Sequence, residues 1–216
     1  QLDIIGDIAS NINALANALT VQKSWDFDYY MRVIKEVRTR TSKYFEDTRF
    51  PILPQRAVNM IREQLADEDI VTLDNGVYKI WFARNYDCAQ PNTMLLDNAL
   101  ATMGAGLPSG MAAKMVHPEK KVVSVCGDGG FMMNSQEMET AVRLGLNLTV
   151  IILNDNAYGM IKWKQSGMGF DNFGLDLGNP DFVKYAESYG ATGHRPTSCE
   201  DFEKTLDACV NGTGVH

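Results

Sequence analysis

The fold is decided by two stretches of this sequence, KVVSVCGDGGF at residues 121–131 and LTVIILNDNAYGM at residues 148–160. Each begins with a largely apolar run of a length typical of a buried strand. The first run ends in a glycine-rich turn that contains an acid, and the second ends in the polar cluster Asn-Asp-Asn. The residues between the runs are enough for one helix, so the two strands are expected to be parallel and close together in one sheet.

Two acidic residues, Asp128 and Asp155, directly follow these strands. Open α/β sheets bind ligands at the carboxyl ends of their strands, so both carboxylates are expected at a ligand-binding edge. Hard divalent cations take oxygen ligands and usually share them with phosphate groups, and glycines let backbone N–H groups approach phosphate closely. Either cluster alone is ordinary turn chemistry. Together they predict a divalent cation that holds a diphosphate.

The rest of the chain alternates between helix and strand patterns, which predicts an α/β fold with a parallel sheet and helices on both faces. Strands are expected at residues 70–73, 121–126 and 148–153. Helices are expected at residues 55–65, 96–115, 135–144, 181–189 and 199–210.

The first quarter of the chain has a different character. Residues 1–7 read as a strand and residues 10–19 as a short helix, so we interpret residues 1–24 as the tail of a preceding central domain. Residues 25–54 read as a charged surface helix followed by a proline-containing linker. The functional domain is then expected at residues 55–216, truncated at its C-terminus because the last six residues read as the turn into a further strand.

Composition excludes several classes of partner. The formal net charge of −7 over 216 residues argues against nucleic acid, whose phosphates attract basic surfaces. The longest apolar runs fall far short of the roughly 20 residues that span a bilayer, so no membrane is expected. The four cysteines are scattered without a Cys-x-x-Cys pair, so no zinc site is visible in the sequence and a reduced, cytoplasmic or organelle-matrix setting is expected. His194 and His216 have no visible partner in the sequence.

The paired motif resembles the metal and diphosphate motif of thiamine diphosphate-dependent enzymes. Within that family, several further stretches look like acetolactate synthase (acetohydroxyacid synthase), and the resemblance extends over about residues 55–216. These stretches are residues 76–81 (GVYKIW), 102–108 (TMGAGLP), 128–139 (DGGFMMNSQEME), 158–161 (YGMI), 179–182 (NPDF) and 185–191 (YAESYGA). The resemblance implies the thiamine diphosphate-binding fold, with the chain as the C-terminal diphosphate-binding domain.

The resemblance also implies roles for individual residues. Asp128 and Asp155 would bind Mg²⁺ through their carboxylates, and Ala157 through its backbone carbonyl. Asparagine is commoner in the family where Asp155 stands, so the extra charge here would face the diphosphate. Met103 would support the bent cofactor beneath its rings, and Met160 would line the reaction cavity. The implied cofactor contacts are Gly76, Val77, Tyr78, Thr102, Met103, Gly127, Asp128, Gly129, Gly130, Asp155, Tyr158, Gly159 and Met160.

Each of these roles has a structural alternative. Without the resemblance, methionines at apolar positions such as Met103 and Met160 are more often core residues than cofactor contacts. Tyr78 is equally well read as a packed aromatic side chain.

The implied activity is decarboxylation of pyruvate and transfer of the two-carbon unit to a second 2-keto acid, as in branched-chain amino acid biosynthesis. The family places its cofactor between this domain and the pyrimidine-binding domain of another subunit, so a homodimer or homotetramer is expected and the chain alone would be inactive. The FAD of biosynthetic members would lie mostly in the central domain, outside this chain.

Three alternatives stay open. The first is another thiamine diphosphate-dependent 2-keto acid decarboxylase or carboligase, and the second is a non-catalytic cofactor-binding module. The third, a generic nucleotide-binding domain, is disfavoured because the sequence contains neither Gly-x-Gly-x-x-Gly nor Gly-x-x-x-x-Gly-Lys-Ser/Thr.

Overall fold

The computed structural model describes residues 3–21 and 24–216, which form two compact units that meet between Arg40 and Thr41. The first unit contains the helices α1 (Ile8–Ala18) and most of α2 (Asp28–Thr41). The strand expected at residues 1–7 is wrong over its described part: residues 3–7 lead directly into α1, where the Asp7 carboxylate caps the helix by accepting from the Ser10 N–H at 2.8 Å. Residues 1 and 2 lie outside the described residues.

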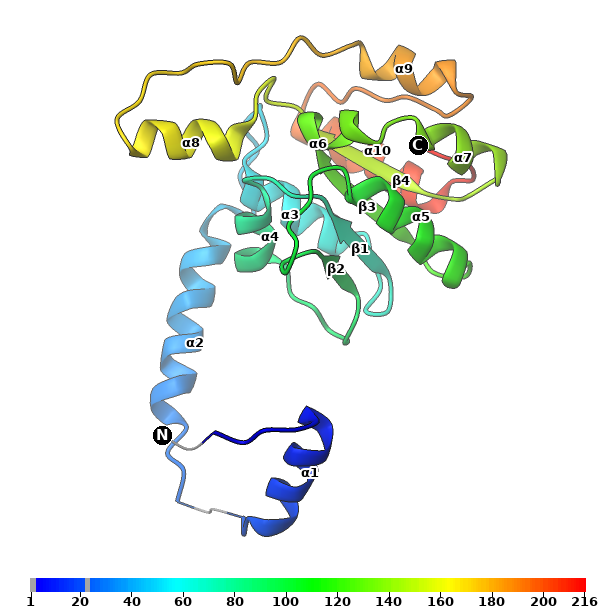
Figure 1. The fold of residues 1–216 in the computed structure, drawn as a ribbon. Helices are drawn as coiled ribbons and strands as arrows, with labels where there is room; N and C mark the ends of the chain where they lie inside the picture. Colours follow the sequence, from blue (N-terminus) through cyan, green and yellow to red (C-terminus); the bar gives the residue numbers. More distant parts are fainter. Residues whose placement is uncertain (1–2, 22–23) are drawn as a thin grey trace. The chain divides into compact units, whose positions relative to one another are not determined.

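The second unit is built on a parallel sheet with the strand order β2-β1-β3-β4 (Figure 1). This result confirms the predicted α/β class. The strands expected at residues 70–73, 121–126 and 148–153 are all present within one residue of the predicted bounds. The four strands are β1 (Ile70–Leu73), β2 (Met94–Leu96), β3 (Val122–Gly127) and β4 (Thr149–Leu153).

Strands β3 and β4 are direct neighbours, with Gly127 paired to Leu153 at their carboxyl ends. The residues that follow these two ends are Asp128 and Asn154. The two polar clusters of the sequence therefore meet at one edge of the sheet, as predicted.

Both faces of the sheet are covered, because successive side chains of a strand point to opposite faces. On one face, Ile70 and Val122 pack with Leu107 and Met111 from one helix and Met138 from another. The other face buries a second cluster, built from Val71, Val123 and Val125 together with Val58, Ile61, Phe82 and Leu206. The sheet is therefore buried between two apolar clusters.

Most helices of the second unit pack against this sheet, whereas α8 (Gly159–Gly167) projects away from it (Figure 1). In chain order, the helices of this unit are the short 3₁₀ helix η1 (Ser42–Tyr44), α3 (Pro54–Glu63), α4 (Lys79–Asn85), α5 (Gly106–Val116), α6 (Asp128–Met133), α7 (Glu137–Arg143), α8, α9 (Phe182–Ser188) and α10 (Cys199–Asn211). None of the helices in residues 3–21 and 24–216 is long and apolar enough to cross a membrane.

The helix expected at residues 96–115 is wrong in its first half. Its first residue ends strand β2, and α5 begins only at Gly106, because Gly104 adopts a positive φ of 86° that interrupts a right-handed helix. Helices α4, α6 and α8 were not expected. Each is nine residues or shorter and begins beside a glycine or tyrosine of the site.

The last residues of the chain begin a further parallel pairing with β4. Leu148 forms a bridge with Val215, and the Val150 N–H donates to the His216 carbonyl at 2.8 Å.

Candidate functional site

The first acidic residue of the site, Asp128, lies where β3 ends and α6 begins. Its side chain is only 2% exposed. One carboxylate oxygen accepts from the Gly129 N–H at 2.9 Å, and the other accepts from the Asn179 amide at 2.6 Å. A buried carboxylate is costly without partners, so this position is built to hold a negative charge.

The second acidic residue, Asp155, lies in the turn after β4. Its carboxylate accepts from the Ala157 N–H at 3.3 Å, and the next residue, Asn156, has a positive φ of 55°, which asparagine tolerates. The pKa of the Asp155 carboxyl is raised, first by partial removal from water and then by the negative charge of Asp128. The charge of Asp128 thus disfavours ionisation of Asp155, and a bound cation would relieve that repulsion.

The Asn179 side chain marks the point where oxygens of this site converge. Its amide nitrogen lies 2.6 Å from Asp128 Oδ2, 3.0 Å from Asn154 Oδ1 and 3.1 Å from Asn156 Oδ1. A primary amide has two hydrogens and cannot satisfy three acceptors at once. Oxygens of this kind are the ligands that a hard divalent cation prefers. Of the three predicted metal ligands, only Asp128 contributes an oxygen to this point.

Two glycines keep space open beside the carboxylates. A Cβ at Gly129 would lie 2.8 Å from Cε1 of Tyr158, and a Cβ at Gly159 would lie 2.6 Å from Oδ2 of Asp155. Neither position accepts a side chain without moving a predicted ligand contact. The backbone can therefore come close to a bound phosphate, which the glycine-rich sequence predicted.

The sequence allowed two roles for Tyr78, a packed aromatic side chain and a cofactor contact. Its ring is buried in the core beside Phe82 and Val125, which is the packing role. Its hydroxyl is also buried, and it has no hydrogen-bond partner among the described residues. Burial raises the pKa of this hydroxyl, so it stays protonated. The hydroxyl is covered by protein atoms, so it could reach a ligand oxygen only if a neighbouring group moved.

A cavity of about 860 Å³ connects these groups. Thr102 is not among its lining residues; its backbone carbonyl accepts from the Asn75 amide at 2.6 Å instead. The other predicted site residues all line the cavity: Gly76, Val77, Tyr78, Met103, Gly127, Asp128, Gly129, Gly130, Asp155, Ala157, Tyr158, Gly159 and Met160.

Asp74 is a residue of this edge that the sequence reasoning missed. It directly follows β1, and its side chain is completely buried. Its carboxylate accepts from the backbone N–H groups of Asn75 at 2.6 Å, Gly104 at 2.9 Å and Gly106 at 3.1 Å. Asp74 thereby fixes the loop that carries Met103. The sequence contained a signal for this residue, because Asp74 directly follows an apolar strand, as Asp128 does.

Comparison with known proteins identifies the class to which this fold and site belong. The family described as "Thiamine pyrophosphate enzyme, C-terminal TPP binding domain" matches residues 74–216. Thiamine pyrophosphate is another name for thiamine diphosphate. The chain therefore belongs to the thiamine pyrophosphate enzymes and contains their C-terminal cofactor-binding domain.

Within that class the chain is similar to acetolactate synthases. It is 35% identical to acetolactate synthase of Bacillus subtilis over 99% of this chain and 38% of that protein. It is 34% identical to the catabolic acetolactate synthase of Raoultella terrigena over 99% of this chain and 39% of that protein. The resemblance noted in the sequence is thus confirmed. The chain spans under two-fifths of the length of these relatives.

A solved structure confirms the fold. The thiamine diphosphate-dependent 4-hydroxybenzoylformate decarboxylase of Rhodococcus jostii superposes on 75% of this chain and 31% of its own, with a TM-score of 0.71 and 23% identity. At this identity the likeness shows a shared fold and not a shared substrate.

Proposed function

We propose that this chain is the diphosphate- and metal-binding part of a thiamine diphosphate- and Mg²⁺-dependent acetolactate synthase. The observation that carries the proposal is the pair Asp128 and Asp155 at the carboxyl ends of neighbouring strands. In this assignment residues 55–216 are the diphosphate-binding domain, residues 25–54 are the linker, and residues 1–24 belong to a central domain.

The carboxylates of Asp128 and Asp155 and the carbonyl of Ala157 would hold Mg²⁺, which would offset the negative charge of the diphosphate. Backbone and side-chain groups of Gly76, Val77, Tyr78, Gly129, Gly130 and Tyr158, which line the same cavity, would contact the diphosphate.

When bound, thiamine diphosphate supplies an electron sink for decarboxylation, and the protein supplies orientation and electrostatics. Met103 and Met160 line the same cavity and would contact the reacting part of the cofactor. Their apolar side chains would keep water from the reacting carbon. The loop that carries Met103 is held by Asp74, so this contact would be fixed before the substrate arrives.

The proposed reaction takes pyruvate and a second 2-keto acid and yields carbon dioxide and a 2-acetolactate-type acid. The chain would work in a homodimer or homotetramer, paired with the pyrimidine-binding domain of another subunit, and would be inactive alone. We also propose a role in branched-chain amino acid synthesis in the cytoplasm or an organelle matrix, with any FAD held outside this chain. The names of the relatives support the activity.

The test is turnover of pyruvate by the whole protein, with and without thiamine diphosphate and Mg²⁺, with the products identified. Acetolactate that forms only when both are present supports the proposal. If free acetaldehyde forms in place of acetolactate, the protein is a decarboxylase and the proposed carboligation is wrong. Cofactor binding without turnover of any 2-keto acid would indicate the non-catalytic module.

A further inference from the structure

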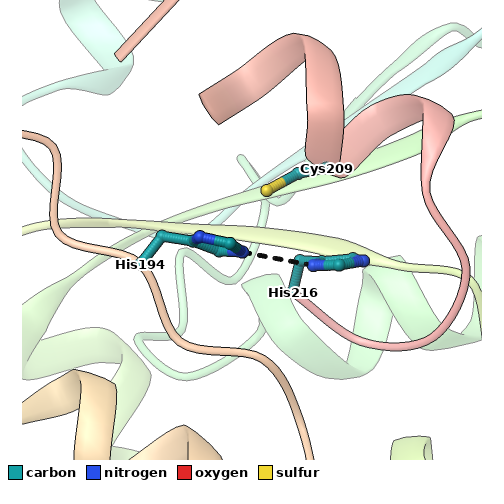
Figure 2. A group of neighbouring side chains, drawn as sticks. All are labelled: His194, Cys209 and His216. Carbon is teal, nitrogen blue, oxygen red and sulfur yellow. Dashed lines mark hydrogen bonds between the residues drawn. The ribbon is translucent and has the colours of Figure 1, made fainter. Parts of the chain in front are cut away.

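A second group of metal-ligating side chains lies away from the carboxylates. Figure 2 shows His194 from the loop before α10, Cys209 from the end of α10 and His216 from the end of the chain, with both rings beside the sulfur. One potential ligand atom from each residue lies within 4.8 Å of the other two. The expectation that His194 and His216 have no partner is wrong, because these histidines hydrogen-bond to each other at 3.3 Å.

The distances are close to those of a zinc centre. Tetrahedral zinc with Zn–N bonds of about 2.0–2.1 Å and a Zn–S bond of about 2.3 Å separates two nitrogens by about 3.3 Å and a nitrogen from a sulfur by about 3.6 Å. The His194 and His216 nitrogens already have the first separation. The sulfur must approach the nitrogens by at most about 1.2 Å, which side-chain rotation can supply.

The hydrogen bond at the far side of His216 prepares this ring to bind a metal. Its Nε2 lies 3.1 Å from the Thr213 carbonyl, which can only accept, so Nε2 carries the hydrogen and Nδ1 presents its lone pair toward His194. Metal-binding histidines commonly donate their second ring nitrogen to a backbone carbonyl in this way.

The backbone around the cluster is held in place before any ion binds. The His216 N–H donates to the Leu148 carbonyl, and the Thr192 N–H donates to the Val215 carbonyl at 2.9 Å. Cys209 is buried on the last turn of the 13-residue helix α10. The ordering cost of binding would therefore fall mainly on the exposed His194 side chain.

We propose that His194, Cys209 and His216 bind a Zn²⁺ ion, with water as the fourth ligand. Zinc is favoured over Mg²⁺ because two imidazole nitrogens and a thiolate suit a borderline-soft ion, whereas Mg²⁺ takes oxygen ligands. The ion would tie the loop at residues 191–198 to the end of α10. On binding, the Cys209 thiol releases its proton, and the hydrogen on His194 Nε2 moves to Nδ1.

Zinc binding has to remove the proton of the Cys209 thiol. Burial raises the pKa of the Cys209 thiol to about 11, so the free sulfur is a thiol. A bound cation would compensate the buried negative charge of the thiolate.

This cluster lines the same cavity as the proposed diphosphate site, but the two groups of residues lie toward opposite ends of β4. His216 pairs with β4 at Val150, whereas Asp155 follows the other end of that strand. Five residues of strand span about 16 Å, so an ion at each position can be tested independently. The failure of one proposal leaves the other unaffected.

The test is Zn²⁺ binding by the whole protein with saturating Mg²⁺ and thiamine diphosphate, measured by competition with a chromophoric chelator. We expect one zinc ion per chain. His194→Ala removes an exposed ligand without disturbing the core and should weaken binding by more than about tenfold. With Co²⁺ in place of zinc, Cys209→Ser should abolish the thiolate-to-cobalt absorption band.

Matched controls use the same residue types outside the cluster. His117→Ala and Cys88→Ser change an exposed histidine and an exposed cysteine, and both should bind zinc as the unchanged protein does. If Cys209→Ser fails to fold, His194→Ala carries the test alone. Equal zinc affinity in His194→Ala and the unchanged protein, or no zinc bound by the unchanged protein, would overturn the proposal.

Discussion

Replacing Asp74 by asparagine should loosen the loop that presents Met103. The Asp74 carboxylate is completely buried and is acceptor-only, and it takes hydrogen bonds from the Gly104 and Gly106 N–H groups and from Asn75. An asparagine has nearly the same shape but turns one acceptor oxygen into a donor. At least one backbone N–H then faces another donor and loses its partner.

The magnitude follows from the burial of these groups. A buried donor left without a partner costs about 1–3 kcal/mol. With about 2 kcal/mol for one such donor, opening of the loop becomes about thirtyfold more frequent. The assay is native-state hydrogen exchange of the whole protein, followed in a peptide that covers residues 102–107. Amide exchange in that peptide should accelerate by about this factor, and peptides from α7 should keep their rates.

The control variant is Asp171→Asn, which makes the same chemical change at an exposed position. It should leave exchange at residues 102–107 unchanged. If Asp74→Asn also leaves these rates unchanged, the carboxylate does not hold the loop, and the reasoning about Met103 is refuted.

Two further predictions concern the diphosphate site. Gly129→Ala places a Cβ 2.8 Å from the Tyr158 ring, so the affinity for thiamine diphosphate, measured by calorimetry, should fall by about tenfold. The control variant Gly167→Ala adds a Cβ where no atom lies within 4 Å, so its affinity should not change. Asp155→Asn should raise the melting temperature of the metal-free protein at neutral pH. The pKa of Asp155 in the folded protein lies above its ordinary value, so the folded protein loses stability as the pH rises through that pKa and the side chain ionises, and asparagine cannot ionise. Below the ordinary pKa the two proteins should melt alike, and added Mg²⁺ should stabilise the unchanged protein more.

Each of these outcomes can fail clearly. Unchanged cofactor affinity in Gly129→Ala would show that Tyr158 and the space beside it do not contact the cofactor. A metal-free Asp155→Asn protein that melts at or below the temperature of the unchanged protein at neutral pH would show that Asp128 and Asp155 do not repel each other.

The parts of the fold that the sequence predicts are those with strong local signals. The apolar runs at β1, β3 and β4 have no competing interpretation, and the polar clusters at their ends locate the ligand edge. Strand β2 has only three residues and no alternation, so no period identifies it. The seven-residue helix α4 and six-residue helix α6 are too short for a helical period and depend on packing against the sheet.

The site residues that were not predicted from the sequence depend on contacts between distant segments of the chain. Asn179 lies 51 residues beyond Asp128 and reaches it only because the chain returns across the sheet edge. His194 and His216 meet because the chain end pairs with β4. No sequence spacing predicts these long-range contacts. Asp74 could have been predicted, because it follows an apolar strand as Asp128 does.

The central claim is that Asp128 and Asp155 hold a divalent cation that binds the diphosphate of the cofactor. The most direct measurement is thiamine diphosphate binding by the whole protein, with and without Mg²⁺, in unchanged and Asp128→Asn forms. The account predicts Mg²⁺-dependent binding that Asp128→Asn weakens by about tenfold or more, a loss of about 1.4 kcal/mol. Equal affinity in both forms, or binding that is indifferent to Mg²⁺, would contradict it.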